Sequence, residues 1–269
     1  MSYQRAPLKW AGGKYGLLDD ILSALPAGER LIEPFAGSAV VSLNVDTPRV
    51  WVNDRNADLI ALYRYVKRDC EGFIRRTRRL FGPQGNTREH YLARRAEFNA
   101  CEDPSRRAVL FYYLLSHGYN GLSRFNARGE WNVPFGRHTD PRVKTEALRA
   151  LSTRLHRARI TDWDFRRVMR QAQPGDVVYL DPPYDSDSNG FTCYTGTRFT
   201  RADHGDLVAL AEDLQQRGVP VVLSNHATAL AQELCQGAQV QHLQVRRNIS
   251  CNGQRRRRAA EILATYIPL

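Results

Sequence analysis

A short polar segment after an apolar run is the most chemically specific feature of the sequence. Asp181-Pro182-Pro183-Tyr184 directly follows residues 177–180, a run with the length and apolar character of a buried strand. In a parallel sheet, ligands bind beyond the carboxyl ends of the strands, so this segment is expected to line a site. The Asp181 carboxylate and the Pro182 carbonyl can each accept an N–H from an amino group conjugated to a ring. That pairing aims the nitrogen lone pair at an incoming methyl group, and Tyr184 can stack on the ring.

A strand-ending turn is the alternative for the same four residues, because Asp-Pro pairs are common in turns. Proline, however, fixes φ and so keeps the carbonyl of Pro182 aimed in one direction. The position directly after a buried run favours the catalytic interpretation.

Two further strand ends carry residues suited to an adenosine-containing cofactor. The small residues Ala36-Gly37-Ser38-Ala39 follow an expected strand at 31–35 and open the next helix, where the backbone can approach a ligand closely. Asp54 follows an expected strand at 50–53, and a carboxylate there can bind both hydroxyls of a ribose. A helix N-cap is the alternative role for Asp54. The sequence lacks G-x-G-x-x-G at this place, so a dinucleotide site is poorly supported.

Composition favours a cytoplasmic protein with a polyanionic partner. The 269 residues include 39 Lys and Arg against 28 Asp and Glu, a formal net charge of +11. Basic side chains displace condensed counterions from phosphates, so this excess favours nucleic acid as the partner. No apolar stretch approaches the roughly 20 residues of a membrane span, and no signal-peptide core follows the N-terminus. Five scattered cysteines without a CxxC pair indicate reduced thiols rather than disulfides or a zinc site.

The order of expected elements indicates a doubly wound α/β core with an insertion. Apolar runs of strand length alternate with stretches of helical spacing, as in proteins built on a parallel sheet. Strands are expected at 31–35, 50–53, 160–163, 177–180, 219–223 and 260–267, and helices at 59–66, 145–157 and 207–214. Residues 67–142 break this rhythm, because they are rich in arginine and aromatics, with a helical stretch at 108–116 and a turn-rich segment at 118–137. We interpret them as an inserted, mostly helical subdomain.

Several motifs, in this order, resemble those of the Dam group of DNA adenine-N6 methyltransferases. They are Lys9-Trp10-Ala11-Gly12-Gly13-Lys14, Pro34-Phe35-Ala36-Gly37-Ser38, the insertion motifs at 119–126 and 129–137, Asp181-Pro182-Pro183-Tyr184, residues 191–194 and Ser224-Asn225-His226. The resemblance covers almost the whole chain. It implies a Rossmann-like methyltransferase core at residues 1–56 and 145–269 and a target-recognition, DNA-binding subdomain at 57–144. We expect a monomer that acts on double-stranded DNA and has no membrane association, metal ion or obligate protein partner.

The resemblance assigns a site for S-adenosyl-L-methionine residue by residue. The matching cofactor positions are Trp10, Lys14, Asp54 and Asp181, with Phe35 and the backbone around Gly37 lining the pocket and Asp164 and Phe165 receiving the adenine. Lys14 suits the methionine carboxylate, and Asp54 suits the ribose. The catalytic residues are Asp181, Pro182 and Tyr184, which carry out a direct transfer without a covalent enzyme intermediate.

The resemblance also implies that the bases of 5′-GATC-3′ are read. In the family, Lys9 matches a residue that contacts the first guanine, and Arg124 matches a base-reading arginine. Both kinds of side chain can donate hydrogen bonds to guanine O6 and N7. The matching apolar contacts are Leu122 and Pro134. The residues that match positions entering the duplex or contacting the partner of the flipped adenine are Tyr119 and Asn120. Ordinary packing is the alternative for Tyr119, Leu122 and Pro134.

The remaining basic and polar positions are expected to grip the backbone or to be structural. The predicted phosphate contacts are Arg95, Asn126, Asn132 and Arg137, which position the protein without specifying sequence. His138 stands where close relatives often carry tyrosine. The Arg255–Arg258 run is interpreted as a solvated charged segment.

The sequence therefore predicts a site-specific DNA adenine-N6 methyltransferase, and three alternatives stay open. Cytosine-N4 methyltransferases usually carry serine, and glutamine methyltransferases asparagine, where Asp181 stands. A sequence-specific DNA-binding protein that has lost its activity is the third alternative. Intact Asp181, Pro182 and Tyr184 favour an active enzyme over it.

Overall fold

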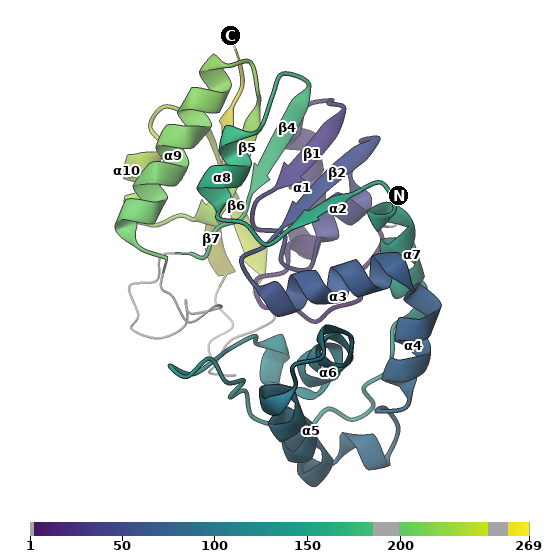
Figure 1. The fold of residues 1–269 in the computed structure, drawn as a ribbon. Helices are drawn as coiled ribbons and strands as arrows, with labels where there is room; N and C mark the ends of the chain where they lie inside the picture. The colour runs from purple at the N-terminus through teal and green to yellow at the C-terminus, as the bar shows by residue number, and fades with distance from the viewer. Residues whose placement is uncertain (1–2, 185–198, 247–257, 269) are drawn as a thin grey trace.

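One sheet organises the computed structural model, which describes residues 3–184, 199–246 and 258–268 (Figure 1). Within these ranges the strands are β1 (Arg30–Glu33), β2 (Arg49–Asn53), β3 (Arg159–Thr161), β4 (Asp176–Leu180), β5 (Val221–His226), β6 (Gln239–Arg246) and β7 (Arg258–Tyr266). They lie in the order β3-β2-β1-β4-β5-β7-β6. Strands β1 to β5 pair in parallel, and β7 is antiparallel to both of its neighbours. The α/β architecture predicted from the sequence is confirmed.

Helices cover both faces of this sheet (Figure 1). The described helices of the core are η1 (Lys14–Leu17), α1 (Leu18–Ala24), α2 (Val40–Asn44), α3 (Ala57–Arg68), α7 (Thr145–Leu155), α8 (Phe165–Arg170), α9 (Arg201–Gln216) and α10 (Ala229–Leu234). Side chains alternate between the faces of a strand, so Leu31 and Val177 join the cluster of α1, α2 and α7, whereas Ile32 and Val178 join that of α8 and α9. Burial on both faces explains why these strands are continuous apolar runs.

Several predicted boundaries are wrong for physical reasons. The strand expected at 31–35 ends at Glu33, and the helix expected to open at 36–39 begins only at Val40. Gly37 and Ala39 have φ values of 48° and 55°, and a left-handed backbone does not continue into a right-handed helix. Among the other differences, β3 ends at Thr161, α7 ends at Leu155 and β5 begins at Val221, whereas α3 and α9 extend beyond the predicted bounds at both ends.

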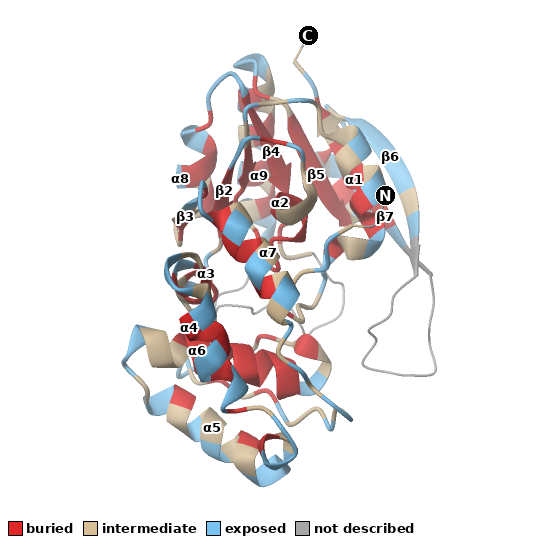
Figure 2. Ribbon diagram, turned by 90° about the vertical axis from the view of Figure 1, so that its right-hand side faces the viewer, coloured by how far each residue is buried: buried red, intermediate tan, exposed pale blue. Residues whose placement is uncertain are grey.

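Strand β6 is not predicted by the sequence pattern. Its described side chains are mostly exposed, as Figure 2 shows, because it lies at the edge of the sheet. An exposed edge strand needs no apolar run, and therefore it lacks the signal that identifies the buried strands.

The inserted segment is helical, as predicted, and it packs below the sheet core (Figure 1). Its described helices are α4 (Cys70–Arg78), η2 (Gln84–Asn86), α5 (Arg88–Ala100), α6 (Pro104–His117) and η3 (Tyr119–Gly121). Helix α6 forms its axis, since all residues from 108 to 117 are buried and α3, α4 and α5 pack against it. Helix α3 also contacts α7 and β3, so one apolar cluster runs from the core into the insertion. The boundary at residue 57 and the target-recognition role stay predictions.

None of the described helices is both long enough and apolar enough to span a membrane. Among the same residues, no group of three or more His, Cys, Asp or Glu side chains is arranged to hold a metal ion. Cys70, Cys101 and Cys235 are free thiols, and Cys193 and Cys251 lie outside the described ranges.

We predict that Arg154 stabilises the turn between α2 and β2. Its guanidinium donates to the carbonyl oxygens of Ser42 and Thr47, each at 2.7 Å, and of Val45 at 3.1 Å. Arg154→Met keeps most of the aliphatic stem but leaves these acceptors without a donor, so the free energy of unfolding should fall by about 2 kcal/mol or more. Urea denaturation measures this loss.

Arg157→Met is the matched control, because Arg157 is exposed at the end of the same segment. Its effect should stay within about 0.5 kcal/mol, as for most surface substitutions. Equal, small losses in both variants would contradict the role given to Arg154.

Candidate active site

The ends of three neighbouring parallel strands meet at one edge of the sheet. Strand β1 leads into Pro34-Phe35, β2 into Asp54, and β4 into Asp181. Since β1 lies between β2 and β4, the chain leaves β1 on one side and returns on the other as β4. Such a reversal of strand order is where open α/β sheets bind their ligands. The predicted catalytic and cofactor segments therefore surround one switch point.

The Asp181 carboxylate is held from two sides. Lys14 Nζ lies 2.8 Å from Asp181 Oδ1, and the Ser224 hydroxyl donates to the same oxygen over 3.1 Å. Lys14 is only 6% exposed and also donates to the Gly12 carbonyl over 2.9 Å. A buried ammonium is costly unless a charge and further hydrogen bonds compensate it. The structure thus joins two predicted residues and adds Ser224, whose motif was noticed in the sequence without a role.

Tyr184 is fastened beside this ion pair. Its hydroxyl donates to Glu261 Oε2 over 3.3 Å, and Lys14 Nζ lies 4.6 Å from the centre of its ring. The ring of His226 lies 4.0 Å away, centroid to centroid. Burial, followed by the charges of Asp181 and Glu261, raises the pKa of Tyr184 well above its ordinary value. The side chain is therefore a neutral phenol, suited to stacking and unsuited to acting as a base.

Asp54 is hydrogen-bonded to the glycine loop, the turn around Gly37 after β1, and it does not cap the helix that follows it. The backbone N–H of Gly37 donates to Asp54 Oδ2, and that of Asn56 donates to Oδ1, each over 2.9 Å. Burial raises the pKa of Asp54 to about 6, although these hydrogen bonds lower it. The N-cap of α3 is Asn56, whose side chain accepts from Asp58 and Leu59. The alternative of Asp54 as the helix cap is therefore wrong.

The backbone angle at residue 37 and the neighbouring Trp10 side chain both require glycine at this position. Its φ is +48°, and an added Cβ would lie 2.8 Å from Trp10 Nε1. The Tyr63 hydroxyl donates to the Gly37 carbonyl from the other side. Any larger residue would push the indole or the backbone out of place, so the predicted pair Trp10 and Gly37 form one wall together.

Aromatic rings gather behind this wall. Phe35 lies 5.3 Å from Phe165 and 5.7 Å from Phe199, centroid to centroid. Phe199, which the sequence pattern does not single out, extends the predicted pair. Asp164 caps α8 by accepting from the Arg166 N–H over 3.0 Å. Phe165 is 5% exposed in the core under α8, so contact of Asp164 and Phe165 with a cofactor adenine stays a prediction.

One buried amide joins the strand ends. Asn53 Nδ2 donates to the carbonyls of Pro34 at 2.8 Å and Trp163 at 3.0 Å. Its Oδ1 accepts from the Thr161 hydroxyl at 2.7 Å and the Trp163 N–H at 2.9 Å. No role was predicted for Asn53 from the sequence, although a polar side chain that ends an apolar strand is a recognisable signal.

The predicted base-reading arginine lies on a short hairpin-like loop. Arg124 Nε donates to Asn132 Oδ1 over 2.7 Å, and Nη2 donates to the Asn132 carbonyl over 3.2 Å. A β-bridge pairs Phe125 with Trp131, and Asn126 closes the turn by accepting from Arg128 and Glu130 and donating to Glu130. Asn126 and Asn132 thus have structural partners, and their contact with phosphate stays a prediction.

Lys9 approaches the same subdomain from the N-terminal loop. Its ammonium donates to the Ser116 carbonyl over 3.2 Å, and burial, with the charge of Lys144, lowers its pKa. A Cβ on Gly121 would lie 3.0 Å from Lys9 Cβ, so the two loops are in contact. The ring of His138 is bonded to the Gly118 carbonyl over 3.0 Å, which gives that histidine a structural role.

The other predicted DNA contacts differ in exposure. Tyr119 is 39% exposed, Asn120 next to it has φ of 52°, and Pro134 is exposed, so ordinary packing is disfavoured for Tyr119 and Pro134. Leu122 packs partly against the core. Within the described part of the chain, the side chains of Arg95, in α5, and of Arg137 form no hydrogen bond or ion pair. Residues 191–194 and 255–257 lie outside the described ranges.

The family model and the relatives that match this chain all carry names of adenine-specific DNA methyltransferases. The family model for "D12 class N6 adenine-specific DNA methyltransferase" matches residues 10–249. The DNA adenine methylase of Escherichia coli (strain K12) is 45% identical, covering 100% of this chain and 97% of the relative. That of Serratia marcescens is 44% identical over 99% and 100%, and that of Vibrio cholerae serotype O1 (strain ATCC 39315 / El Tor Inaba N16961) is 39% identical over 100% and 98%.

We predict a pH-dependent stability from Glu33, a buried carboxyl at the end of β1. Burial raises its pKa from 4.5 to about 7, against hydrogen bonds from Ser42 that lower it. The folded state therefore binds this proton more tightly than the unfolded state. The stabilisation is complete below pH 4.5 and is lost as the pH rises through about 7.

Glu33→Gln removes this titration. Relative to the native chain, the variant should gain at most about 3 kcal/mol of unfolding free energy between pH 5 and pH 8. Denaturant titrations at both pH values measure the change, and Glu29→Gln, at an exposed site, is the control. A Glu33→Gln difference that does not vary with pH would refute the assignment.

Proposed function

The chain belongs to the D12 class of N6 adenine-specific DNA methyltransferases, and on that premise we propose that it methylates the exocyclic amine of adenine in double-stranded 5′-GATC-3′, with S-adenosylmethionine as donor. The observation that carries the proposal is the Asp181 carboxylate, held by Lys14 and Ser224 at the end of β4 with Tyr184 beside it. The expected enzyme is a monomer that flips its target adenine out of the duplex.

The two oxygens of Asp181 have different environments. Oδ1 is bonded by Lys14 and Ser224, whereas no described residue donates to Oδ2. Oδ2 is thus the natural acceptor for one N–H of the adenine amine, and the Pro182 carbonyl for the other. Both contacts turn the nitrogen lone pair away from the ring and toward the methyl donor. Most of the acceleration then comes from holding the amine in the reactive orientation.

Tyr184 and Asp181 have two further roles, which are stacking on the adenine and accepting a proton. The neutral Tyr184 ring stacks on the flipped adenine, since its hydroxyl is bonded to Glu261 and its orientation is fixed. After transfer the nitrogen carries a positive charge, and its extra proton leaves to water or to Asp181. No histidine is needed as a general base, because water or Asp181 takes this proton.

The residues near β1 and β2 fit S-adenosylmethionine, which supplies an electrophilic methyl group when bound. Asp54 offers a carboxylate for the ribose hydroxyls, and Lys14 an ammonium for the methionine carboxylate. The Gly37 backbone, which tolerates no side chain against Trp10, supports a close approach by the cofactor. Phe35 gives the pocket an apolar lining, and Asp164 and Phe165 at the start of α8 are the proposed contacts of the adenine.

The hairpin-like loop supports direct reading of the sequence. Asn132 binds the Nε and one Nη2 hydrogen of Arg124, which leaves the Nη1–Nη2 end of the guanidinium for a guanine edge. Lys9, at the junction of the N-terminal loop and Gly121, suits the other guanine. The net charge of +11 agrees with a polyanionic substrate. Serine-based cytosine-N4 chemistry and a silent DNA-binding protein fit poorly with Asp181 and its partners.

We predict that Asp181→Ala loses at least 99% of methyl transfer while Asp213→Ala, at an exposed surface position, retains it. The first change removes the acceptor that orients the amine, and a 100-fold loss corresponds to about 2.7 kcal/mol of barrier. The measurement is methylation of unmethylated plasmid DNA, followed by mapping of modified adenines. Modification outside GATC would contradict the specificity, and more than a tenth of native activity in Asp181→Ala would contradict the role of that carboxylate.

We predict that Arg124 and Arg137 differ in how they affect DNA. A bidentate arginine–guanine pair discriminates by roughly 1–3 kcal/mol, so Arg124→Ala should lower kcat/KM on GATC tenfold or more and affect sites altered at the contacted base pair much less. Arg137→Ala should weaken all duplexes alike and reduce the salt dependence by about one unit of slope. Assays on GATC and single-base variants at two salt concentrations separate them. An equal loss on every duplex in Arg124→Ala would make it a backbone clamp.

A further inference from the structure

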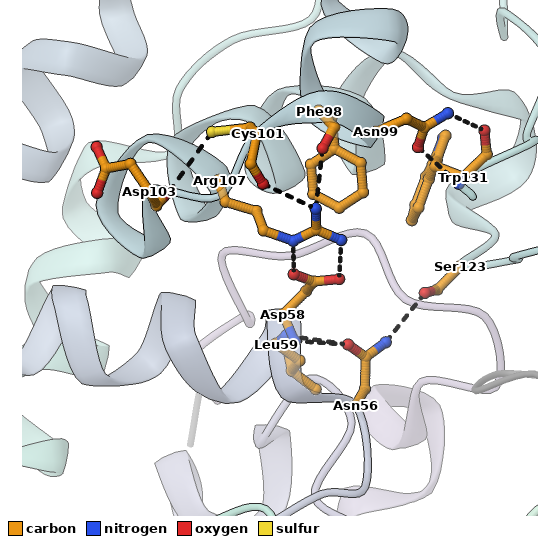
Figure 3. A network of polar contacts seen from close by, with 10 residues as sticks. All are labelled: Asn56, Asp58, Leu59, Phe98, Asn99, Cys101, Asp103, Arg107, Ser123 and Trp131. Carbon is orange, nitrogen blue, oxygen red and sulfur yellow. Dashed lines mark hydrogen bonds and ion pairs between the residues drawn. The ribbon is translucent and has the colours of Figure 1, made fainter. Parts of the chain in front are cut away.

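Asn56 is hydrogen-bonded both to Asp54 of the proposed ribose site and to the recognition loop, the hairpin-like loop that carries Arg124. Figure 3 shows its contact with Ser123 of this loop. On one side its backbone N–H donates to Asp54 Oδ1 over 2.9 Å, and the other oxygen of Asp54 binds the Gly37 N–H. On the other side its Nδ2 donates to the Ser123 hydroxyl over 3.2 Å. Asn56 and Ser123 are each 4% exposed, so water does not compete readily for this bond.

The side chain of Asn56 cannot move freely. Its Oδ1 accepts from the N–H groups of Asp58 and Leu59, each over 3.1 Å, and so caps α3. The cap fixes the direction of Nδ2 toward Ser123. A displacement of Asp54 is therefore passed to the first turn of α3 and to the Ser123 hydroxyl together.

Ser123 is the residue immediately before the proposed base-reading Arg124. The loop beyond Ser123 is stiff, because the Asn132 side chain accepts from the Arg124 guanidinium. The backbone N–H of Asn132 also donates to the Arg124 carbonyl over 3.2 Å. Asn99 clamps the far arm by accepting from the Trp131 N–H over 2.8 Å and donating to its carbonyl over 3.2 Å. Because these hydrogen bonds make the loop rigid, the position of Ser123 determines the position of Arg124.

The helices around this contact are locked to one another. Arg107 forms a two-pronged ion pair with Asp58 at the start of α3, as Figure 3 shows. The same guanidinium donates to the carbonyls of Phe98 at 2.9 Å and Cys101 at 3.2 Å, where α5 ends. With α3, α5 and α6 joined in this way, the Asn56–Ser123 bond links the start of α3 directly to the recognition loop.

We propose that the Asn56–Ser123 hydrogen bond couples the two substrates: a cofactor held by Asp54 fixes Asn56, which positions Arg124 for its base and strengthens binding of the target duplex. The inference rests on the proposed function and extends it to two positioning residues. Coupling of this kind is reciprocal, so DNA must raise the affinity for the cofactor by the same factor.

The test compares the dissociation constant of a GATC duplex with and without saturating S-adenosylhomocysteine. In the native chain the ratio of the two constants measures the coupling. In Ser123→Ala, which leaves the α3 cap intact, the ratio should fall about fivefold, the factor that one ordinary hydrogen bond supports. Affinity for S-adenosylhomocysteine in the absence of DNA should stay as in the native chain. Asn56→Ser, which keeps a good N-cap but cannot reach Ser123, should lower the ratio equally, and the double variant should lower it no further.

Ser105→Ala is the matched control, because Ser105 accepts a hydrogen bond from Arg68 over 3.1 Å and so joins the far end of α3 to α6. This variant loses a serine hydrogen bond to α3 that does not involve the recognition loop, so it should keep the native ratio. An unchanged ratio in Ser123→Ala, an equal fall in Ser105→Ala, or a native ratio of one would each overturn the proposal. Failure of the proposed function looks different, because the native chain would then not methylate GATC plasmid DNA at all.

Discussion

The fully satisfied amide of Asn53 is the interaction on which the site depends. The amide donates two hydrogen bonds and accepts two. These bonds join the end of β2 to Pro34 after β1 and to Thr161 and Trp163 at the end of β3. A buried amide is costly unless each of its groups is paired, so this arrangement permits few alternatives. The glycine loop, Asp54 and the start of α8 inherit their positions from it.

The site also concentrates charge where the fold would be more stable without it. Lys14 is almost fully buried against Asp181, and burial raises the pKa values of Asp54 and Glu33 to about 6 and about 7. Each group carries a desolvation cost that apolar side chains would avoid. Clustered perturbed carboxyls in a ligand crevice are characteristic of functional sites. Here Glu33 and Asp54 lie at the ends of β1 and β2, beside the place where we propose that the cationic methyl donor and the adenine amine meet.

Helix α3 makes the inserted segment part of the same body. It packs on α6 of the insertion and on α7 and β3 of the core, and its first turn lies between Asp54 and the recognition loop. An insertion that shares an apolar cluster with the core is less free to move than one on a flexible linker. The distance between the proposed methyl-transfer site and the recognition loop is therefore set by packing.

The sequence by itself determined the chemistry and the order of the parts. Asp181-Pro182-Pro183-Tyr184 after a buried run, Asp54 after another, and a basic helical insertion identify the architecture and the family resemblance, because strand burial and turn residues are local signals. Tertiary structure alone decided which side chains meet. Lys14 with Asp181, Asn53 across three strands and Asn56 with Ser123 are contacts between residues far apart in the chain, which no local pattern specifies. The left-handed backbone at Gly37 and Ala39 and the exposed edge strand β6 were likewise set by neighbours rather than by propensity.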